Sequence, residues 1–101
     1  MRMAHQGDIL HVEGIKAPVL VCSKDFFNQS SMIVACPLLE TGQEGPLHIS
    51  VQTEQARTAL VHCEKLALLD LSLRGWKKAD RLPLSQFWEI SDAIQGIFDY
   101  L

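Results

Sequence analysis

Short apolar runs separated by polar segments make up the first seventy positions of the chain. Two of these runs, residues 19–22 and 32–39, are dense in apolar side chains and too short for core helices. They therefore predict buried β-strands. Residues 9–13 and 47–51 interleave apolar with polar side chains, as strands with one face toward water do. The longer run 59–71 carries charged interruptions and predicts a strand with a bend or bulge midway.

The C-terminal segment follows a different period. Its large apolar residues recur every three or four positions, which places them on one face of a helix. Ser85 is a candidate N-cap, and Glu89 and Asp92 lie near the N-terminal end, where the helix dipole favours acids. Trp88 falls beside this stripe and is free to face a partner. The stripe consists of Phe87, Ile90, Ile94, Ile97 and Leu101.

The connecting segments complete the fold prediction. Residues 23–31 are polar around two phenylalanines and favour a short helical turn, whereas residues 41–46 contain two glycines and a proline and predict a loop. Consecutive strands with short connections favour antiparallel pairing, and closing the sheet removes its exposed edges. We therefore expect one domain, residues 1–101, that is mainly β. Its form is a small closed antiparallel β-barrel of four or five strands with a C-terminal α-helix.

The composition narrows the functional classes. Of the 101 residues, 48% are apolar, which suffices for a core, and the net charge is −3. This charge argues against nucleic-acid binding through bulk electrostatics but leaves room for a local basic patch. Trp76 lies among cations and could stack on a base of a single-stranded nucleic acid, or pack on the end of the barrel within a solvated turn. The candidate nucleic-acid-binding residues are Arg74, Trp76, Lys77 and Lys78.

The cysteines and the N-terminus indicate the compartment. Cys22, Cys36 and Cys63 each lie in an apolar run without CxxC spacing, so we expect buried, reduced thiols. Residues 1–6 are polar and contain no apolar region of a secretion signal, and no stretch is long enough to span a bilayer. We expect a cytoplasmic protein without a membrane segment.

Several motifs, in order along the chain, resemble the PemK/MazF toxin family. Residues 7–12, Gly-Asp-Ile-Leu-His-Val, are similar to the opening strand of the family, and residues 18–21 and 33–37 to its second and third strands. The strongest stretch is Val-His-Cys-Glu-Lys-Leu-Ala-Leu-Leu-Asp at 61–70, with an Arg-Gly turn and a Leu-Pro pair after it. The resemblance implies an SH3-like barrel with a C-terminal helix, a homodimer, cleavage of single-stranded RNA without a metal, and neutralisation by an antitoxin.

The chain departs from this family on the surface that would hold RNA. The catalytic arginine of the family precedes the second-strand proline, where this chain has Ala17, with Lys16 beside it as the nearest cation. A Ser or Thr follows the third-strand proline in the family, whereas here Leu39 stands in that place and Thr41 is the nearest hydroxyl. An Arg-Thr pair of the family is replaced by Ala and Leu at 67–68, and the first loop is short.

His62 and Glu64 are the candidates for catalysis, together with Lys16. They occupy positions where one branch of the family uses an Arg and an Asp, and residues i and i+2 of a strand share one face. The histidine would act as general acid or base, oriented by the carboxylate. The alternative is a surface histidine beside a solvated glutamate. We expect no metal and no cofactor, because chain spacing pairs none of the remaining histidines as ligands: His5, His11 and His48.

Two functions remain open at this point. The first is a toxin of a type II toxin–antitoxin system that cleaves single-stranded RNA with these replacement residues. The second is a catalytically inactive dimeric binding module that holds an antitoxin-like peptide or another protein partner. A gyrase poison on the same fold ranks last, because the C-terminal residues do not match the tail that such poisons use.

Overall fold

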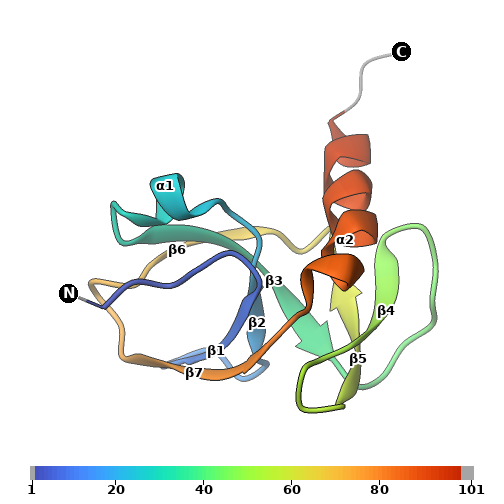
Figure 1. Ribbon diagram of the computed structural model, residues 1–101, viewed down its shortest axis with the longest axis horizontal. Helices are drawn as coiled ribbons and strands as arrows, with labels where there is room; N and C mark the ends of the chain where they lie inside the picture. Colours follow the sequence, from blue (N-terminus) through green and yellow to red (C-terminus); the bar gives the residue numbers. More distant parts are fainter. Residues whose placement is uncertain (1, 99–101) are drawn as a thin grey trace.

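A computed structural model describes residues 2–98 as a strongly curved antiparallel sheet with a helix at its C-terminal end (Figure 1). Within these residues there are seven strands and two helices. The mainly β fold with a C-terminal helix, which the sequence predicts, is confirmed. In chain order the elements are β1 Asp8–Val12, β2 Val19–Val21, α1 Asp25–Asn28, β3 Met32–Leu39, β4 His48–Gln52, β5 Thr58–His62, β6 Ala67–Asp70, β7 Trp76–Arg81 and α2 Leu84–Ile97.

The long strand β3 organises the sheet. Its first half, residues 32–35, pairs with β6, its last two residues pair with β5, and β2 pairs with its opposite edge. The strand order is β4-β5-β3-β2-β1-β7, with β6 beside β3 outside this path. The sheet therefore has two layers that share β3. In Figure 1, β1, β2, β6 and β7 curl on one side, and β4 and β5 stand on the other side beneath α2.

The prediction of a closed barrel is wrong for the described residues. The sheet curls, but its hydrogen-bonded path ends at β4 and at β7. β6 and β7 follow each other in the chain, yet β6 pairs with β3 and β7 pairs with β1, so no ladder joins them. At the other end, the backbone N–H of Gln52 in β4 donates to the side-chain oxygen of Gln86 in α2 (3.2 Å). The helix thus accepts a hydrogen bond from the exposed edge of β4, which another strand would have paired in a closed barrel.

Two strand predictions also differ from the structure. The run 59–71 is not one bent strand, because a turn at 63–66 separates β5 from β6. In this turn the backbone N–H of Lys65 donates to the carbonyl of His62 (3.1 Å). Residues 76–81, expected within a basic turn, form β7. This strand has a charged outer side and no dense apolar run, which is typical of an edge strand.

Helix α2 has the predicted apolar face but a different start. Pro83 is its N-cap, and no side-chain cap hydrogen bond is present in the described chain, so the prediction of Ser85 as N-cap is wrong. Trp88 is 73% exposed, as its place beside the stripe predicts, and Leu101 lies outside the described residues. Across residues 2–98, no helix combines the length and the apolar character needed to cross a membrane. The face of α2 that meets the core consists of Phe87, Ile90, Ala93 and Ile94.

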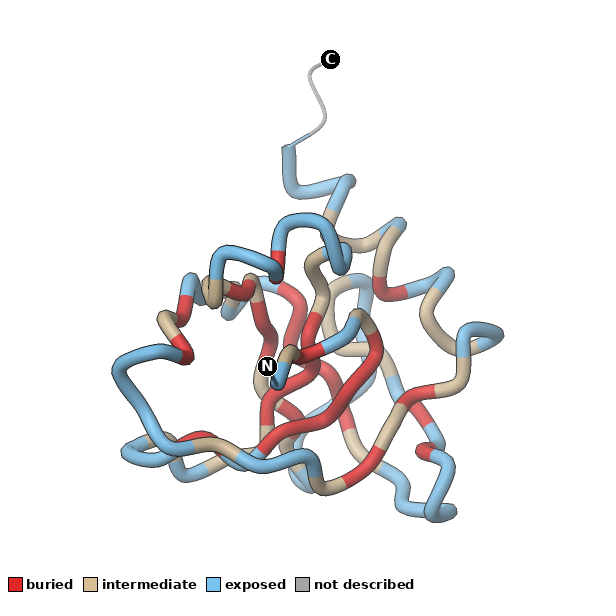
Figure 2. Tube along the Cα trace, turned by 60° about the vertical axis from the view of Figure 1, so that its left-hand side comes forward, coloured by how far each residue is buried: buried red, intermediate tan, exposed pale blue. Residues whose placement is uncertain are grey.

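The core lies on both sides of the central strands, where Figure 2 shows the buried segments in red. One cluster, which contains Leu10, fills the inside of the curl formed by β1, β2, β3 and β6. The other cluster, which contains Ile90, lies between the sheet and α2. Along β2, Val19 and Val21 belong to the first cluster and Leu20 to the second. This strand is therefore buried at every position, as strands covered on two faces are.

A buried ion pair joins the start of β1 to the end of β7. Asp8 is 3% exposed, and its carboxylate accepts hydrogen bonds from the Arg81 guanidinium (2.7 Å) and from the backbone N–H of His5 (2.9 Å). Gly7 before it has a φ of 94°, and a Cβ there would lie 3.3 Å from the carbonyl oxygen of Leu82. Only glycine fits this turn without strain. The Gly-Asp motif therefore holds two strands together.

All three cysteines are free thiols in the part of the chain that the structure describes. Cys36 and Cys63 are buried, and Cys22 is half-buried. Burial is the main cause that raises the pKa of the Cys63 thiol, to about 12. This thiol therefore stays protonated at neutral pH and packs as a small apolar side chain.

Candidate functional site

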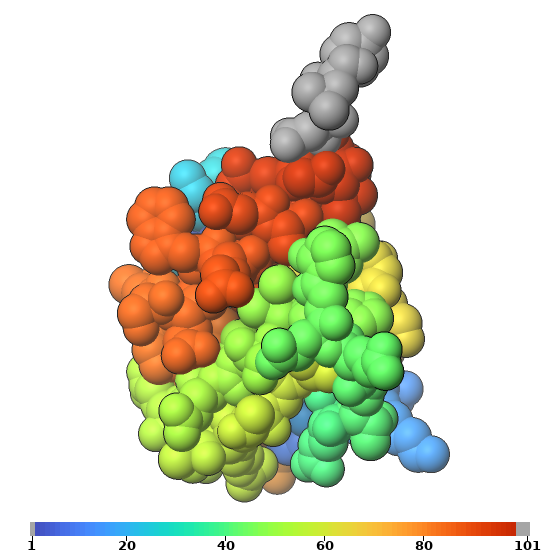
Figure 3. Space-filling view, turned by 90° about the vertical axis from the view of Figure 1, so that its right-hand side faces the viewer, coloured from blue at the N-terminus to red at the C-terminus, as the bar shows by residue number. Residues whose placement is uncertain are grey.

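A pocket of about 300 Å³ opens where the two layers of the sheet meet. β1 forms its floor, and its walls come from the end of β3, from β7 and from the loop that connects β4 to β5. Figure 3 shows a hollow near the lower edge of the view, between residues near 40 and residues near 58, with the blue of β1 visible inside it. Its walls therefore come from segments that are far apart in the sequence.

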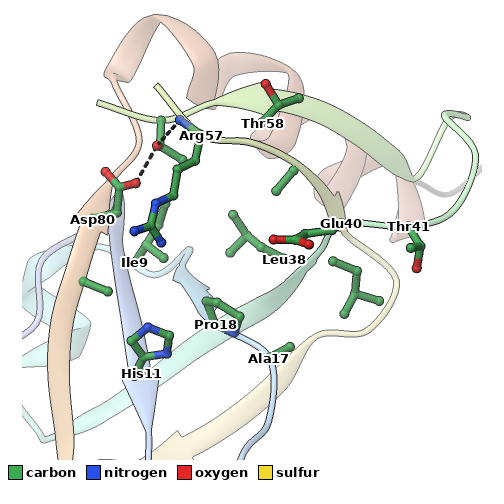
Figure 4. A pocket seen from close by; sticks show the side chains of 14 residues that line it. Ile9, His11, Ala17, Pro18, Leu38, Glu40, Thr41, Arg57, Thr58 and Asp80 are labelled. Atoms are coloured by element: carbon green, nitrogen blue, oxygen red, sulfur yellow. Dashed lines mark hydrogen bonds between the residues drawn. The ribbon is translucent and has the colours of Figure 1, made fainter. Parts of the chain in front are cut away.

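Arg57 supplies positive charge to this pocket. It ends the loop between β4 and β5, and Figure 4 shows its guanidinium reaching inward from that loop. The hydroxyl of Thr53 donates to Oδ2 of Asp80 (2.5 Å) and accepts from the backbone N–H of Arg57 (3.2 Å), which fixes the loop. Ala56 has a φ of 61°, a left-handed conformation that costs a non-glycine residue about 1–2 kcal/mol. Strain of this kind persists where surrounding contacts hold the loop, as the hydrogen bonds of Thr53 do here.

Asp80 is the buried negative group of the pocket wall. Burial alone would raise its pKa, but the hydrogen bonds from Thr53 and from the backbone N–H groups of Arg81 and Gln55 act in the opposite direction, as does the charge of Arg57. Together these contacts hold the pKa of Asp80 below its usual value. The carboxylate is therefore ionised at neutral pH and interacts with the arginine that enters the pocket.

His11 and Glu40 reach the same pocket from other strands. His11 is the exposed position of β1, and Glu40 directly follows β3. In Figure 4, Glu40 and Arg57 point inward from opposite sides, and His11 stands on the floor side below Arg57. A guanidinium binds phosphate through two parallel N–H groups, and an imidazole or a carboxylate transfers protons. The pocket therefore holds a group for phosphate binding and two groups for proton transfer.

Some of the positions where this chain departs from the PemK/MazF pattern also lie in the pocket, whereas Ala67 and Leu68 lie on β6 outside its described lining. Ala17 and Pro18 line one side, and Leu39 and Thr41 line another. Neither alanine nor leucine can bind a phosphate oxygen, so the pocket depends on Arg57 for that role. The sequence analysis missed Arg57, because it is a lone cation in a polar connector and no motif marks it. Only the folding of the β4–β5 hairpin brings it to the pocket.

The three residues predicted to be catalytic are absent from the described lining of this pocket. Lys16 is exposed in the loop between β1 and β2, next to Ala17. His62 is only 7% exposed, and Glu64 forms its hydrogen bond with Nε2 of His48 (2.7 Å), not with His62. The structure thus brings His48, His62 and Glu64 into one group beside the pocket. The sequence alone did not link His48 to His62 and Glu64.

Hydrogen bonding and burial determine the charges in this group. The hydrogen bond with Glu64 is the main cause that raises the pKa of His48, and the same bond lowers the pKa of Glu64. Burial, and then the neighbouring charge of His48, lowers the pKa of His62. Near neutral pH, Glu64 is therefore ionised and His62 is a neutral imidazole.

The basic residues predicted to bind RNA lie on β7 and in the turn before it. Trp76 is half-buried against the first core cluster, and the guanidinium of Arg2 lies 3.8 Å from the centroid of its ring. Arg74, Lys77 and Lys78 are exposed. In the described structure, none of these four predicted residues lines the pocket. A base could stack on Trp76 only after Arg2 moves, and the role of this patch in RNA binding stays a prediction.

Comparison with solved structures identifies relatives of the fold. A chain of the MazE–MazF complex (Form-I) from Deinococcus radiodurans has a TM-score of 0.86 and 16% identity, covering 97% of this chain and 98% of that one. An endoribonuclease from a mycobacterial species has a TM-score of 0.84 and 17% identity over 97% of this chain and 93% of its own. At such low identity the likeness shows the fold alone.

Sequence comparison identifies the family. No curated protein matches the chain. The family model of the PemK-like, MazF-like toxins of type II toxin–antitoxin systems matches residues 5–98, which is nearly the whole chain. This match includes every strand, both helices and all residues of the pocket. The protein therefore belongs to the family of PemK-like, MazF-like toxins of type II toxin–antitoxin systems.

Proposed function

We propose that this protein is the toxin of a type II toxin–antitoxin pair and that it cleaves single-stranded RNA, without a metal, in the pocket between the two layers. The observation that carries the proposal is the convergence of Arg57, His11 and Glu40 on one cavity. The family supports the same function. The chain lacks the arginine and the hydroxyl that the family pattern places here, and the structure offers other groups of suitable chemistry in the same space.

RNA can be cut by its own 2′-hydroxyl. That oxygen attacks the neighbouring phosphorus, the bond to the 5′-oxygen of the next nucleotide breaks, and a 2′,3′-cyclic phosphate and a 5′-hydroxyl result. The step requires a base for the 2′-proton, an acid for the leaving oxygen, and a cation for the charge that develops on the phosphate. Arg57 would supply the cation, while Glu40 and His11 would act as base and acid.

The other proposed properties follow from the family and from the charge of the chain. We expect a homodimer in the cytoplasm and an acidic antitoxin segment that competes with RNA for the pocket. One of the structural relatives is an endoribonuclease in complex with its cognate antitoxin from a mycobacterial species, with a TM-score of 0.76. Because the net charge of this chain is −3, RNA affinity would depend on local cations such as Arg57 and the β7 patch, and would fall with added salt.

The decisive experiment is cleavage of a mixed single-stranded RNA by the purified protein in the presence of a chelator. Arg57→Ala should lower the cleavage rate by about a hundredfold or more, because it removes the only proposed phosphate cation of the pocket. Lys24→Ala, which changes an exposed cation outside both the pocket and the basic residues of β7, is the matched control and should leave the rate within about threefold. Equal loss in both variants, or none in Arg57→Ala, would disprove the proposed site.

A second function is favoured by the apolar part of the pocket. Ile9, Leu38 and Ala17 form a wall that suits the side chain of a peptide better than a phosphate. In this alternative the protein is an inactive dimeric module that holds an antitoxin-like peptide or another protein. RNA of every sequence would then remain intact, expression would not arrest growth, and Ala17→Asp, at the half-buried rim of this wall, would abolish capture of the protein encoded by the adjacent gene.

A further inference from the structure

Three potential metal ligands meet at the end of the β4–β5 hairpin. His48 and His62 are direct cross-strand partners in the antiparallel ladder, and their rings stack with centroids 4.0 Å apart at 24°. Glu64 follows in the turn after β5. One nitrogen of each histidine and one carboxylate oxygen all lie within 4.8 Å of one another. The spacing of residues along the chain does not reveal cross-strand neighbours of this kind. For this reason no metal was expected from the sequence.

The hydrogen bonds of His48 require a cation at its Nε2. Its Nδ1 lies 3.2 Å from the carbonyl oxygen of Gln43, which only accepts, so Nδ1 must carry a proton. Its Nε2 lies 2.7 Å from Oε2 of the Glu64 carboxylate, and a carboxylate also only accepts. A lone pair cannot face a carboxylate oxygen at this distance. Either a second proton or a metal ion must therefore lie between them.

His62 favours the metal ion over the proton. This residue is only 7% exposed. Neither of its ring nitrogens has a protein hydrogen-bond partner among the described residues. A proton on His48 satisfies Glu64 but leaves both nitrogens of His62 without a hydrogen bond of good geometry, although the backbone of Thr41 lies close to the ring. A metal ion uses a lone pair of His62 as well, so it accounts for all three side chains. Buried polar groups in native proteins are seldom left unpaired.

We propose that His48, His62 and Glu64 form a binding site for one divalent transition-metal ion, and that zinc is the ion their donors suit best. Two imidazoles and one carboxylate are a common ligand set for zinc, with water in the fourth position. Bond lengths near 2.0–2.2 Å place tetrahedral ligand atoms about 3.3 Å apart. Nε2 of His48 and Oε2 of Glu64 are 2.7 Å apart, so ion binding requires the Glu64 carboxylate, which is 39% exposed, to move away from the His48 ring.

The site is structural in this proposal and separate from RNA cleavage. None of the three ligands is part of the described pocket lining. The Nδ1–H of His48 bonds to the loop between β3 and β4 at Gln43, in the arrangement by which a backbone carbonyl orients a metal-bound histidine. Gly42 in that loop lies against His62, since a Cβ there would be 3.6 Å from its Nε2. The ion would therefore fasten this loop onto the end of the β4–β5 hairpin.

The test is zinc binding by untagged full-length protein that has been stripped with a chelator. Titration calorimetry should show one zinc ion per chain, and thermal unfolding should shift upward with zinc because the ion binds the folded state. His48→Gln and Glu64→Gln should each weaken zinc binding at least tenfold. His5→Gln is the matched control, because Nδ1 of His5 lies 2.8 Å from Asp25 in another exposed histidine–carboxylate pair, and it should bind zinc like wild type.

Cobalt absorption supplies a second readout that does not depend on RNA cleavage. Cobalt bound to two nitrogens and an oxygen gives weak visible bands that disappear when zinc is added. A strong near-ultraviolet thiolate-to-cobalt band would place the ion on cysteines and overturn the proposal. So would the absence of saturable zinc binding, or equal affinity in wild type and His48→Gln. RNA cleavage in a chelator tests the proposed function alone, so either proposal can fail without the other.

Discussion

Replacing Thr53 by valine removes one hydroxyl from the wall of the pocket and nearly keeps the volume of the side chain. That hydroxyl donates to Oδ2 of buried Asp80 (2.5 Å) and accepts from the backbone N–H of Arg57 (3.2 Å). A hydrogen bond to a charged group contributes about 1.5–3 kcal/mol and a neutral one about 0.5–1.5 kcal/mol. Asp80 keeps its backbone donors at Gln55 and Arg81 and stays ionised. We therefore expect a loss of about 2–3 kcal/mol in the free energy of unfolding.

Urea unfolding of four proteins measures this effect: wild type, Thr53→Val, Asp80→Asn and the double variant. If the hydroxyl and the carboxylate act as one unit, the double variant is less destabilised than the sum of the single ones by about 1 kcal/mol or more. Thr58→Val is the matched control, because this exposed threonine also lines the pocket but makes no side-chain hydrogen bond among the described residues. It should change stability by less than about 0.5 kcal/mol.

The RNA cleavage rate gives a second readout for the same variant. Thr53→Val frees the backbone N–H of Arg57 and loosens the loop, so the rate should fall even under conditions where the variant is fully folded. A loss of stability below about 1 kcal/mol, or strictly additive effects of the two substitutions, would refute the view that this hydroxyl holds the loop.

Three further predictions concern stability and are read by equilibrium unfolding. The stability that ionised Asp80 contributes is present above about pH 4 and is lost as pH falls through its lowered native pKa. The difference in the free energy of unfolding between wild type and Asp80→Asn should therefore shrink below about pH 4, and a constant difference would contradict this prediction. Ile90→Ala, at a fully buried position of α2, should cost about 2–5 kcal/mol, and a cost under about 1 kcal/mol would mean that α2 is not part of the core. Ala56→Gly should stabilise the protein by about 0.5 kcal/mol because it relieves the positive φ, and a loss of stability would show that the loop is unstrained.

The sequence predicted the elements whose side-chain pattern follows one simple period. β3 was predicted with its observed bounds because both of its faces are covered, and α2 was predicted from its regular apolar stripe. β7 was missed because its only buried side chain is Asp80 and its one large apolar side chain, Trp76, is half-buried. The turn at 63–66 was hidden within a mostly apolar run. Open edges at β4 and β7 depend on which strands pair, which no local pattern records.

The candidate site was predicted only in part, for a related reason. Ala17 and Leu39 were singled out through the resemblance, and both lie in the pocket. Arg57 comes from a polar loop, and the link between His48 and His62 comes from strand pairing. In both cases the chemistry arises from residues that the register of the β4–β5 hairpin brings together. A prediction of that register from the sequence would have exposed both features.

The sharing of β3 by two layers determines how easily the proposed activity can be switched off. The loop with Arg57 belongs to the β4–β5 hairpin. In the described residues, the strand ladder of this hairpin to the rest of the sheet runs through the last two residues of β3, and the hydrogen bonds of its loop to β7 add to this ladder. Detachment of this hairpin would dismantle the pocket while the cluster inside the other layer stayed packed. Such a partial opening requires less free energy than global unfolding. A protease that cuts the detached hairpin would therefore end the proposed RNA cleavage while the chain is still mostly folded.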